Sequence, residues 1–218
     1  MIDCYCLSCL KGIRKNGSIR QLFYVNDVLC SSCRSELFDY RYIFKLDKIT
    51  IEGLYLYTGK IRELLIQYKE YNDEALFPLF LYPYVKQLRK KYRDYSLVVM
   101  CSSKESILKR GFNHMEKMVD ILRMEVIDVL YKSQDISQKH LSFKEREQIG
   151  KYLHLKNEKL LKGKKILLID DVITSGSSIK AAYELIRPHC LDVKVLCVCY
   201  STNFISEKRL KIVKMLGK

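Results

Sequence analysis

The sequence predicts an α/β protein in which helices flank a parallel sheet, with a small cysteine-rich module in front. Residues 166–169 form an unbroken apolar run, which suits a strand buried on both faces of a parallel sheet. This run leads through a polar loop into a segment with helical spacing of apolar residues. Residues 97–100 are a second short apolar run of the same kind. Two C-x₂-C pairs near the N-terminus indicate a separate metal-binding module.

The composition fits a folded chain with a polyanionic partner. The chain has 218 residues, 48% of them hydrophobic, which is enough for one moderate domain and a small module. Its formal charge of +14 favours contact with nucleic acid, although lysines on solvated faces would give the same balance. No apolar run approaches the roughly 20 residues that cross a bilayer, and residues 1–9 lack the apolar stretch of a signal peptide. We therefore expect a cytoplasmic protein without a membrane span.

The N-terminal cysteines have the spacing of a zinc site. Cys6 and Cys9 form one C-x₂-C turn, and Cys30 and Cys33 form the other, with twenty residues between them. Each turn aims two thiolates at one point, and two turns complete a tetrahedron. Paired disulfides are the alternative, and a reducing cytoplasm disfavours them. Cys4 is either a competing ligand or a spare thiol, and we assign the site to Cys6 because the C-x₂-C turn is the stronger unit.

The middle of the chain alternates between strand and helix patterns. Residues 35–47 have the composition of a connector, and residues 49–58 predict one or two strands. Residues 61–68 carry apolar side chains at helical spacing. Residues 75–92 then predict one or two helices interrupted by prolines, and residues 126–130 predict a further strand. The last predicted strand is 193–200, and its two cysteines are interpreted as core residues.

Polar residues follow the strand predicted at 97–100. The sequence C-S-S-K at 101–104 stands at the carboxyl end of that strand, where ligands gather in parallel sheets. A second anion-binding loop would be well placed there, and the alternative is an ordinary turn. The sequence K-R-G-F-N at 109–113 then opens a helix whose core face begins at Met115.

The loop after the 166–169 run has the composition of an anion site. Its hydroxyl donors are Thr174, Ser175, Ser177 and Ser178. Gly176 permits close approach of the backbone, and the start of a helix favours negative charge. Asp170 and Asp171 would repel a phosphate, so they suit hydroxyl groups such as a ribose diol, or a metal ion that accompanies the phosphate. The alternative is a strand–turn–helix in some other α/β protein.

The pattern D-D-V-I-T-S-G-S-S at 170–178 resembles the signature of the type I phosphoribosyltransferases, whose usual form is D-D-V-x-T-T-G-x-T. The resemblance implies a type I phosphoribosyltransferase-like parallel sheet that binds phosphoribosyl pyrophosphate (PRPP) with Mg²⁺. It implies that Asp170 and Asp171 hold the ribose hydroxyls and that residues 174–178 hold the 5′-phosphate. Two threonines of the pattern are serines here, and both keep the hydroxyl.

A second resemblance, to competence ComF proteins of the ComFC kind, extends over essentially the whole chain. It rests on the C-x₂-C pairs, R-G-F-N followed by Glu116, a Q-x-x-L-S-x-x-x-R pattern and the D-D loop, in that order. The third pattern is carried by Gln138, Leu141, Ser142 and Arg146. His114 stands where the family usually has Gln, and C-S-S-K-E-S-I-L-K-R replaces a proline-containing loop with an extra Arg. The resemblance implies that Arg110 binds the ligand and that the third pattern lies in a flexible loop over the active site; the alternative for this region is a solvated linker.

These features divide the chain into a zinc-binding module at 1–45 and a phosphoribosyltransferase-like domain at 46–218. The resemblance implies a role in natural transformation, in which the protein handles single-stranded DNA during DNA uptake in company with a ComFA-type ATPase or helicase. PRPP binding is then the biochemical property. Two alternatives stay open: an active phosphoribosyltransferase of nucleotide metabolism, and a non-catalytic PRPP sensor. The basic segment 206–218 agrees with DNA contact or is a solvated amphipathic helix.

Overall fold

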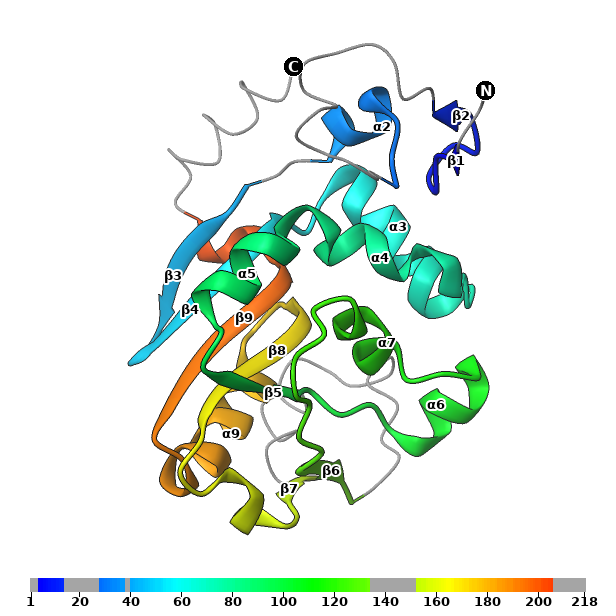
Figure 1. The fold of residues 1–218 in the computed structure, drawn as a ribbon. Helices are drawn as coiled ribbons and strands as arrows, with labels where there is room; N and C mark the ends of the chain where they lie inside the picture. The colour runs from blue at the N-terminus through cyan, green and yellow to red at the C-terminus, as the bar shows by residue number, and fades with distance from the viewer. Residues whose placement is uncertain (1–3, 14–27, 38–39, 134–151, 206–218) are drawn as a thin grey trace.

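The fold was obtained as a computed structural model that describes residues 4–13, 28–37, 40–133 and 152–205 (Figure 1). The strands are β1 (Cys4–Tyr5), β2 (Gly12–Ile13), β3 (Tyr42–Leu46), β4 (Ile49–Leu56), β5 (Tyr95–Val99), β6 (Leu130–Lys132), β7 (Leu153–Leu155), β8 (Lys165–Ile173) and β9 (Asp192–Tyr200). The α-helices are α2 (Ser31–Glu36), α3 (Gly59–Glu70), α4 (Phe77–Leu81), α5 (Val85–Lys91), α6 (Lys104–Arg110), α7 (His114–Asp120) and α9 (Ser177–Ile186). Short 3₁₀ helices lie at Glu74–Leu76, Tyr82–Tyr84, Glu158–Leu161, Arg187–His189 and Thr202–Phe204.

The centre of the fold is a five-stranded sheet with the strand order β3-β4-β9-β8-β5. Strands β4, β9, β8 and β5 are parallel, and β3 pairs antiparallel with β4 at one edge. The predicted α/β fold with a mainly parallel sheet is therefore confirmed. β8 pairs with β5 so that Ile169 lies opposite Val99, which brings the polar segments after these two strands to the same edge of the sheet.

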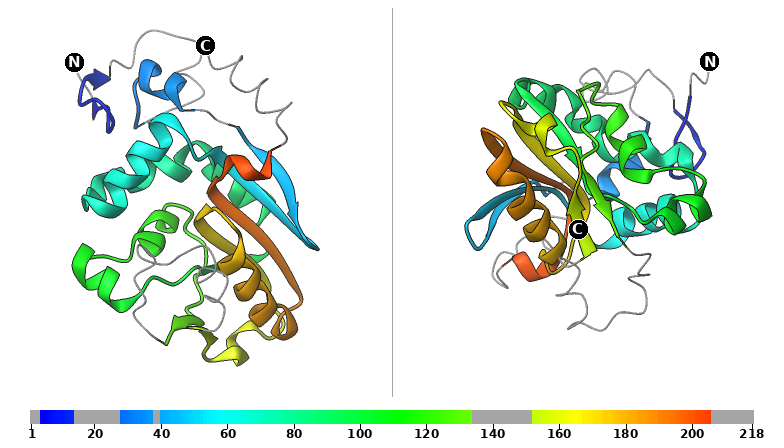
Figure 2. Two further views of the ribbon diagram at one scale, coloured as in Figure 1. Left: turned by 180° about the vertical axis from the view of Figure 1, so that it is seen from behind. Right: turned by 90° about the horizontal axis from the view of Figure 1, so that it is seen from below.

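Helices cover both faces of the sheet, and successive side chains of β8 point to opposite faces. Leu167 and Ile169 belong to the buried cluster that includes residues of α3, α4, α5 and α7. Ile166 and Leu168 belong to the cluster on the other face, which includes the buried residues of α9. The right-hand view of Figure 2 shows the sheet between these layers. Burial on both faces explains why this strand lacks an alternating sequence.

Two segments contain strands that differ from the sequence-based expectation. The 35–47 connector contains the end of α2 and the edge strand β3, which is stabilised by pairing with β4. The strand expected at 126–130 is reduced to a single bridge between Val126 and Leu97, and β6 begins only at Leu130.

The helix expected to open at 109–113 is in fact two helices. Gly111 ends α6 in the left-handed region with a φ of 84°, and the Asn113 side chain accepts a hydrogen bond from the Met115 N–H at the start of α7. The sequence R-G-F-N-H is therefore the joint between α6 and α7. This joint places Arg110 at the end of one helix and His114 at the start of the next.

The N-terminal module shares its buried core with the main domain. Strands β1 and β2 form a short antiparallel ribbon, and α2 begins directly after Cys30. Cys6, Leu29 and Cys33 belong to the same buried cluster as Leu54 on β4 and Tyr68 on α3. The domain boundary at 45/46 stays a prediction. Within the described ranges, no helix combines the length and the apolar character that crossing a membrane requires.

Two sequence patterns lie outside the described residues. The Q-x-x-L-S-x-x-x-R pattern of Gln138, Leu141, Ser142 and Arg146 is one of them, and the basic segment 206–218 is the other.

Candidate functional site

A pocket of about 450 Å³ lies where β8 and β5 end. The predicted site residues that line it are Asp170, Asp171, Thr174, Ser175, Gly176, Ser177, Ser178 and Arg110. The structure therefore brings these residues together, while their roles stay a prediction. The pocket is also lined by Lys69, His114 and Lys132, which no sequence motif had marked as ligand-binding.

The hydroxyl-rich loop requires glycine at position 176 for two reasons. Gly176 has a φ of 83°, in the left-handed region that favours glycine, and it stands immediately before α9. A Cβ added there would lie 2.4 Å from Cδ2 of Leu46 on β3. The Ser175 and Ser177 hydroxyl oxygens lie 3.1 Å apart on the pocket side of this turn. The loop therefore gathers hydroxyl groups and the start of a ten-residue helix at one end of the pocket.

Asp171 is a buried carboxylate held by two partners. Its Oδ2 atom lies 2.5 Å from Nζ of Lys69 and 2.6 Å from Nε2 of His114, and the residue is only 5% exposed. Burial raises the pKa of Asp171, but the Lys69 ammonium and then His114 outweigh burial and hold the pKa well below its usual range. Burial lowers the pKa of Lys69, but Asp171 and then Asp170 raise it and together give a net upward shift. Asp171 is therefore an ionised, internally paired group.

Asp170 has the opposite character. It is half-buried and lines the pocket, and its Oδ1 atom accepts a 2.9 Å hydrogen bond from the Asp171 N–H. Burial, followed by the neighbouring charge of Asp171, raises the pKa of Asp170 to about 7. Two adjacent carboxyl groups thus differ in protonation near neutral pH, and Asp170 is the one that can exchange a proton there.

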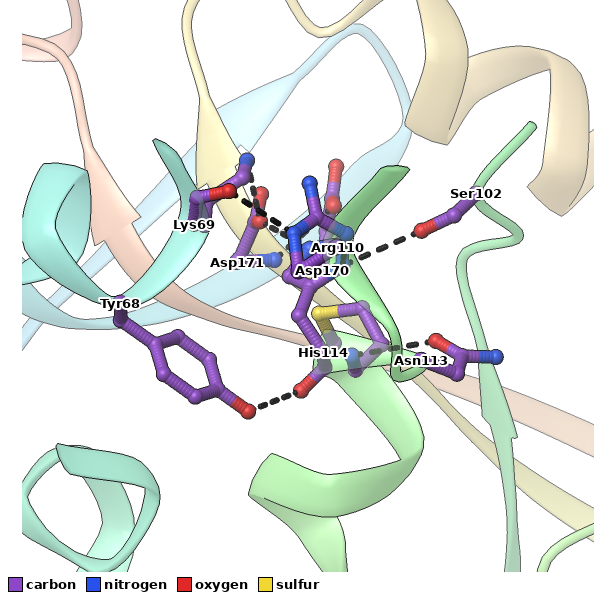
Figure 3. A network of polar contacts seen from close by, with 9 residues as sticks. Tyr68, Lys69, Ser102, Arg110, Asn113, His114, Asp170 and Asp171 are labelled. Atoms are coloured by element: carbon purple, nitrogen blue, oxygen red, sulfur yellow. Dashed lines mark hydrogen bonds and ion pairs between the residues drawn. The ribbon is translucent and has the colours of Figure 1, made fainter. Parts of the chain in front are cut away.

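His114 connects Asp171 to Arg110 (Figure 3). Its Nδ1 atom lies 3.1 Å from Nη1 of Arg110 and 3.1 Å from the Ser102 hydroxyl oxygen. Nε of Arg110 donates a 2.8 Å hydrogen bond to the carbonyl of Lys69 at the end of α3. Four elements, α3, α6, α7 and β8, therefore meet in one network.

The segment after β5 begins a helix rather than ending in a bare turn. The Ser103 hydroxyl accepts a 3.1 Å hydrogen bond from the Ser106 N–H and so caps α6. Ser102, Ser103 and Ser106 all line the pocket. Two hydroxyl-rich segments therefore line the pocket together with the acids, one after β8 and one after β5.

The four predicted cysteine ligands form one cluster away from this pocket lining. The Sγ atoms of Cys6, Cys9, Cys30 and Cys33 all lie within 4.8 Å of one another, and those of Cys9 and Cys30 are 3.8 Å apart. Four thiolates around zinc at about 2.3 Å give sulfur–sulfur edges of about 3.8 Å. The cluster can therefore bind a metal ion, and four protein ligands leave no open position for chemistry. The side chain of Cys4 is outside the described part of the chain.

Comparison with known proteins finds a matching family and a curated relative. Residues 84–216 match the family described as phosphoribosyl transferase domain. The competence protein ComFC of Streptococcus pneumoniae is 28% identical over 139 residues, which are 64% of this chain and 62% of that protein. The chain thus matches less than two thirds of the length of this curated relative. The resemblance to ComFC-type proteins expected from the motifs is confirmed by this match.

Solved structures that are similar to parts of this chain include an adenine and a hypoxanthine phosphoribosyltransferase. Adenine phosphoribosyltransferase from Saccharomyces cerevisiae has 15% sequence identity and a TM-score of 0.40, with 78% of this chain and 86% of that chain covered. A hypoxanthine phosphoribosyltransferase from Staphylococcus aureus has 16% identity and a TM-score of 0.40, with 60% of this chain and 66% of that chain covered. The family match spans more than half of the chain and contains both acids, the hydroxyl-rich loop and Arg110. The chain therefore belongs to the phosphoribosyl transferase domain family.

Proposed function

We propose that the pocket binds PRPP together with Mg²⁺. The observation that carries this proposal is the meeting of three kinds of group in one pocket: a hydroxyl-rich loop at a helix start, a pair of acids, and the cationic side chains of Lys69, Arg110 and Lys132. A phosphorylated sugar with a pyrophosphate group needs an anion site at each end and hydroxyl acceptors between them. The acids would repel a bare phosphate, so they favour a ligand that brings hydroxyl groups or a metal ion.

Each predicted residue has a place in this complex. Thr174, Ser175, Gly176, Ser177 and Ser178 take the 5′-phosphate, and Arg110 takes the pyrophosphate end. Asp170 and Asp171 are the ribose acids, with Asp170 the more accessible of the two. When bound with the ligand, Mg²⁺ neutralises charge on the pyrophosphate. The half-buried Asp170 carboxyl fits such an ion, because Mg²⁺ prefers carboxylate oxygens.

The metal in the cysteine cluster is proposed to be zinc. Four thiolates at tetrahedral spacing are the ligand set that structural zinc sites use. The expected result of elemental analysis is one zinc per chain.

For the biological role we propose action in natural transformation, in which the protein handles single-stranded DNA in the cytoplasm beside a ComFA-type ATPase. The similarity to ComFC and the net charge of +14 support this role. An electrostatic DNA contact should weaken steeply with salt and show little sequence preference. Binding of single-stranded DNA that is equally strong at low and high salt would contradict this part of the proposal.

The deciding experiment is a calorimetric titration with Mg-PRPP, performed with and without single-stranded DNA. The wild-type protein is expected to bind PRPP. Loss of this binding in Asp171→Ala and Gly176→Val would assign the PRPP site to this pocket. Retained affinity in both variants would place the ligand elsewhere. A change in PRPP affinity when DNA is present would indicate that the two ligands are coupled.

An active phosphoribosyltransferase is the second candidate, favoured by the pKa of Asp170 near 7. In that reaction a nitrogen nucleophile forms a bond to C1 of PRPP, the bond from C1 to the pyrophosphate oxygen breaks, and the proton of the nucleophile passes to a base. Asp170 is the candidate base. Pyrophosphate release measured against a panel of bases and amines tests this reaction. PRPP binding without release for any acceptor would favour the third candidate, a non-catalytic PRPP sensor.

A further inference from the structure

His114 occupies an unusual position for a residue at the start of a helix. It is the first residue of α7, it lines the pocket, and it is only 6% exposed. Its ring contacts Asp171 on β8 through one nitrogen and Arg110 on α6 through the other. Its main-chain carbonyl accepts a 2.7 Å hydrogen bond from the Tyr68 hydroxyl on α3 (Figure 3). The residue is therefore fixed from three elements of the fold.

The partners of the ring determine its tautomer. An arginine guanidinium donates hydrogen bonds and cannot accept them, so the Nδ1 atom that faces Nη1 of Arg110 must be the acceptor. The proton then resides on Nε2, which donates to Oδ2 of Asp171. Burial, followed by the charges of Lys69 and Arg110, lowers the pKa of His114, and together they outweigh Asp171, which raises it; this agrees with a neutral ring. His114 thus acts as a donor on one side and an acceptor on the other.

The orientation of Arg110 depends on this contact. Its Nε atom donates to the Lys69 carbonyl, and its Nη1 atom reaches His114. Two contacts at different nitrogens fix the plane of the guanidinium. Within the described residues, Nη2 of Arg110 has no hydrogen-bond partner, so this nitrogen is left for an anion in the pocket that Arg110 lines.

The orientation of Asp171 depends on the same histidine. Oδ2 of Asp171 is shared between His114 and Lys69, so the ammonium of Lys69 is kept at the pocket as well. Without the ring, Arg110 would lose one of its two fixed contacts and Asp171 would lose one of its two partners. One effect falls on Arg110 at the end of α6, and the other falls on Asp171 of β8 with its partner Lys69. Within the described residues, the loop at 174–178 makes no hydrogen bond to His114, so it would keep its own geometry.

We propose that His114 is a positioning residue that joins Arg110 to Asp171, so that Arg110 and Lys69 are held ready for the pyrophosphate end of the ligand. This inference rests on the proposed binding of PRPP. It holds that one neutral side chain keeps the groups at the pyrophosphate end of the pocket in place. The site needs a donor and an acceptor at this position, and it does not need a charge. A glutamine offers the same pair, because its amide NH₂ can donate to Asp171 and its carbonyl can accept from Arg110.

The test compares His114→Gln with His114→Leu in the full chain, with His154→Leu on β7 as a histidine control outside the network. Calorimetry measures the affinities for Mg-PRPP, for inorganic pyrophosphate with Mg²⁺ and for ribose 5-phosphate, and thermal unfolding checks the fold. The leucine variant is expected to bind PRPP and pyrophosphate at least about tenfold more weakly, since the lost hydrogen bonds involve charged groups. Its affinity for ribose 5-phosphate should fall less, because the 5′-phosphate loop is untouched and Asp171 keeps its contact with Lys69. The glutamine variant should bind all three ligands within about threefold of the wild type.

Three outcomes would overturn the inference. One is a leucine variant that binds pyrophosphate as well as the wild type does. Another is equal loss of pyrophosphate and ribose 5-phosphate binding, because this would show a general collapse of the pocket. The third is a glutamine variant as weak as the leucine variant, because donor and acceptor would then not suffice. If the wild-type protein binds none of the three ligands, the proposed function itself fails and this inference fails with it.

Discussion

The hydroxyl of Tyr68 and the main-chain carbonyl of His114 are joined by a 2.7 Å hydrogen bond between two helices. The next residue, Lys69, bonds the side chain of Asp171 and accepts from Arg110 through its carbonyl. Two consecutive residues at the end of α3 therefore hold α6, α7 and β8 together at the pocket. The pocket wall depends on a helix that carries none of the sequence motifs.

Tyr68→Phe should destabilise the protein without leaving a cavity in the core. The ring stays buried, and the carbonyl of His114 loses a donor in a buried setting, which costs roughly 1–2 kcal/mol. Urea denaturation measures this change. Tyr71→Phe is the matched control, because Tyr71 follows the same helix and is 77% exposed. Equal stability losses in the two variants would contradict a role for the Tyr68 hydroxyl.

Gly176→Val should abolish the binding of Mg-PRPP. The new side chain meets Leu46 on β3 and requires a φ of 83° that branched residues avoid, so the loop must move. Gly163→Val is the control. Gly163 also has a positive φ, of 74°, but a Cβ added there meets nothing within 4 Å. The control should lose stability through backbone strain and keep its ligand affinity, as measured by calorimetry. Ligand binding by the Gly176 variant at wild-type strength would remove this loop from the site.

Asp170 should make ligand binding sensitive to pH near neutrality. Because burial and then Asp171 raise its pKa to about 7, the carboxyl becomes protonated as the pH falls through 7, and its capacity to accept ribose hydroxyls or Mg²⁺ declines. The affinity for Mg-PRPP should therefore fall from pH 8 to pH 6. Asp170→Asn should bind weakly at every pH and lose this dependence. A wild-type affinity that is constant over this range would contradict the shifted pKa.

The same shift predicts a gain of stability in Asp170→Asn. A carboxyl whose pKa is raised in the folded state binds more protons folded than unfolded, so stability falls as the pH rises from about 4 to about 7. The variant removes this loss, while its amide oxygen can still accept from the Asp171 N–H. It should be more stable than the wild type at pH 8 by roughly 1 kcal/mol or more, and the difference should vanish near pH 4. Denaturant titrations at the two pH values test the sign of this difference in stability between the variant and the wild type.

Cys33→Ser should release the metal and destabilise the N-terminal module. The side chain is buried and belongs to the four-thiolate cluster, so its loss removes both a ligand and the folding free energy that metal binding supplies. Elemental analysis and thermal unfolding give the two readouts. Cys190→Ser provides the comparison, because Cys190 is outside the cluster and only half-buried. Full metal content in Cys33→Ser would show that the cluster is not the metal site.

Local patterns in the sequence are sufficient for the buried parallel strands, for the cysteine cluster and for the hydroxyl-rich loop. The run at 166–169 indicated a strand covered on both faces, and the spacing of the four cysteines indicated their convergence. β3 was interpreted as part of a connector because its stability comes from pairing with β4 and from contacts between Phe44 and Tyr200 on a distant strand. Such pairing is a tertiary effect that composition does not reveal.

The network around Asp171 was missed for a similar reason. Lys69 is a polar residue at the end of an amphipathic helix, and no spacing relates it to the acids on β8. His114 was noted only as a departure from the usual Gln. The one available signal was chemical: a buried acid pair adjoining an anion site needs a counter-charge, and a nearby cation was therefore to be expected.

The shared core of the cysteine module and α3 has a consequence for metal content. Cys6 and Cys33 pack in the same buried cluster as Tyr68, whose neighbour Lys69 holds Asp171. If metal binding stabilises this shared core, chelation would lower the affinity for the proposed sugar phosphate, and by thermodynamic reciprocity a bound ligand would raise the affinity for the metal. In a cell, the occupancy of the cysteine cluster would set how much of the protein population is competent to bind its ligand.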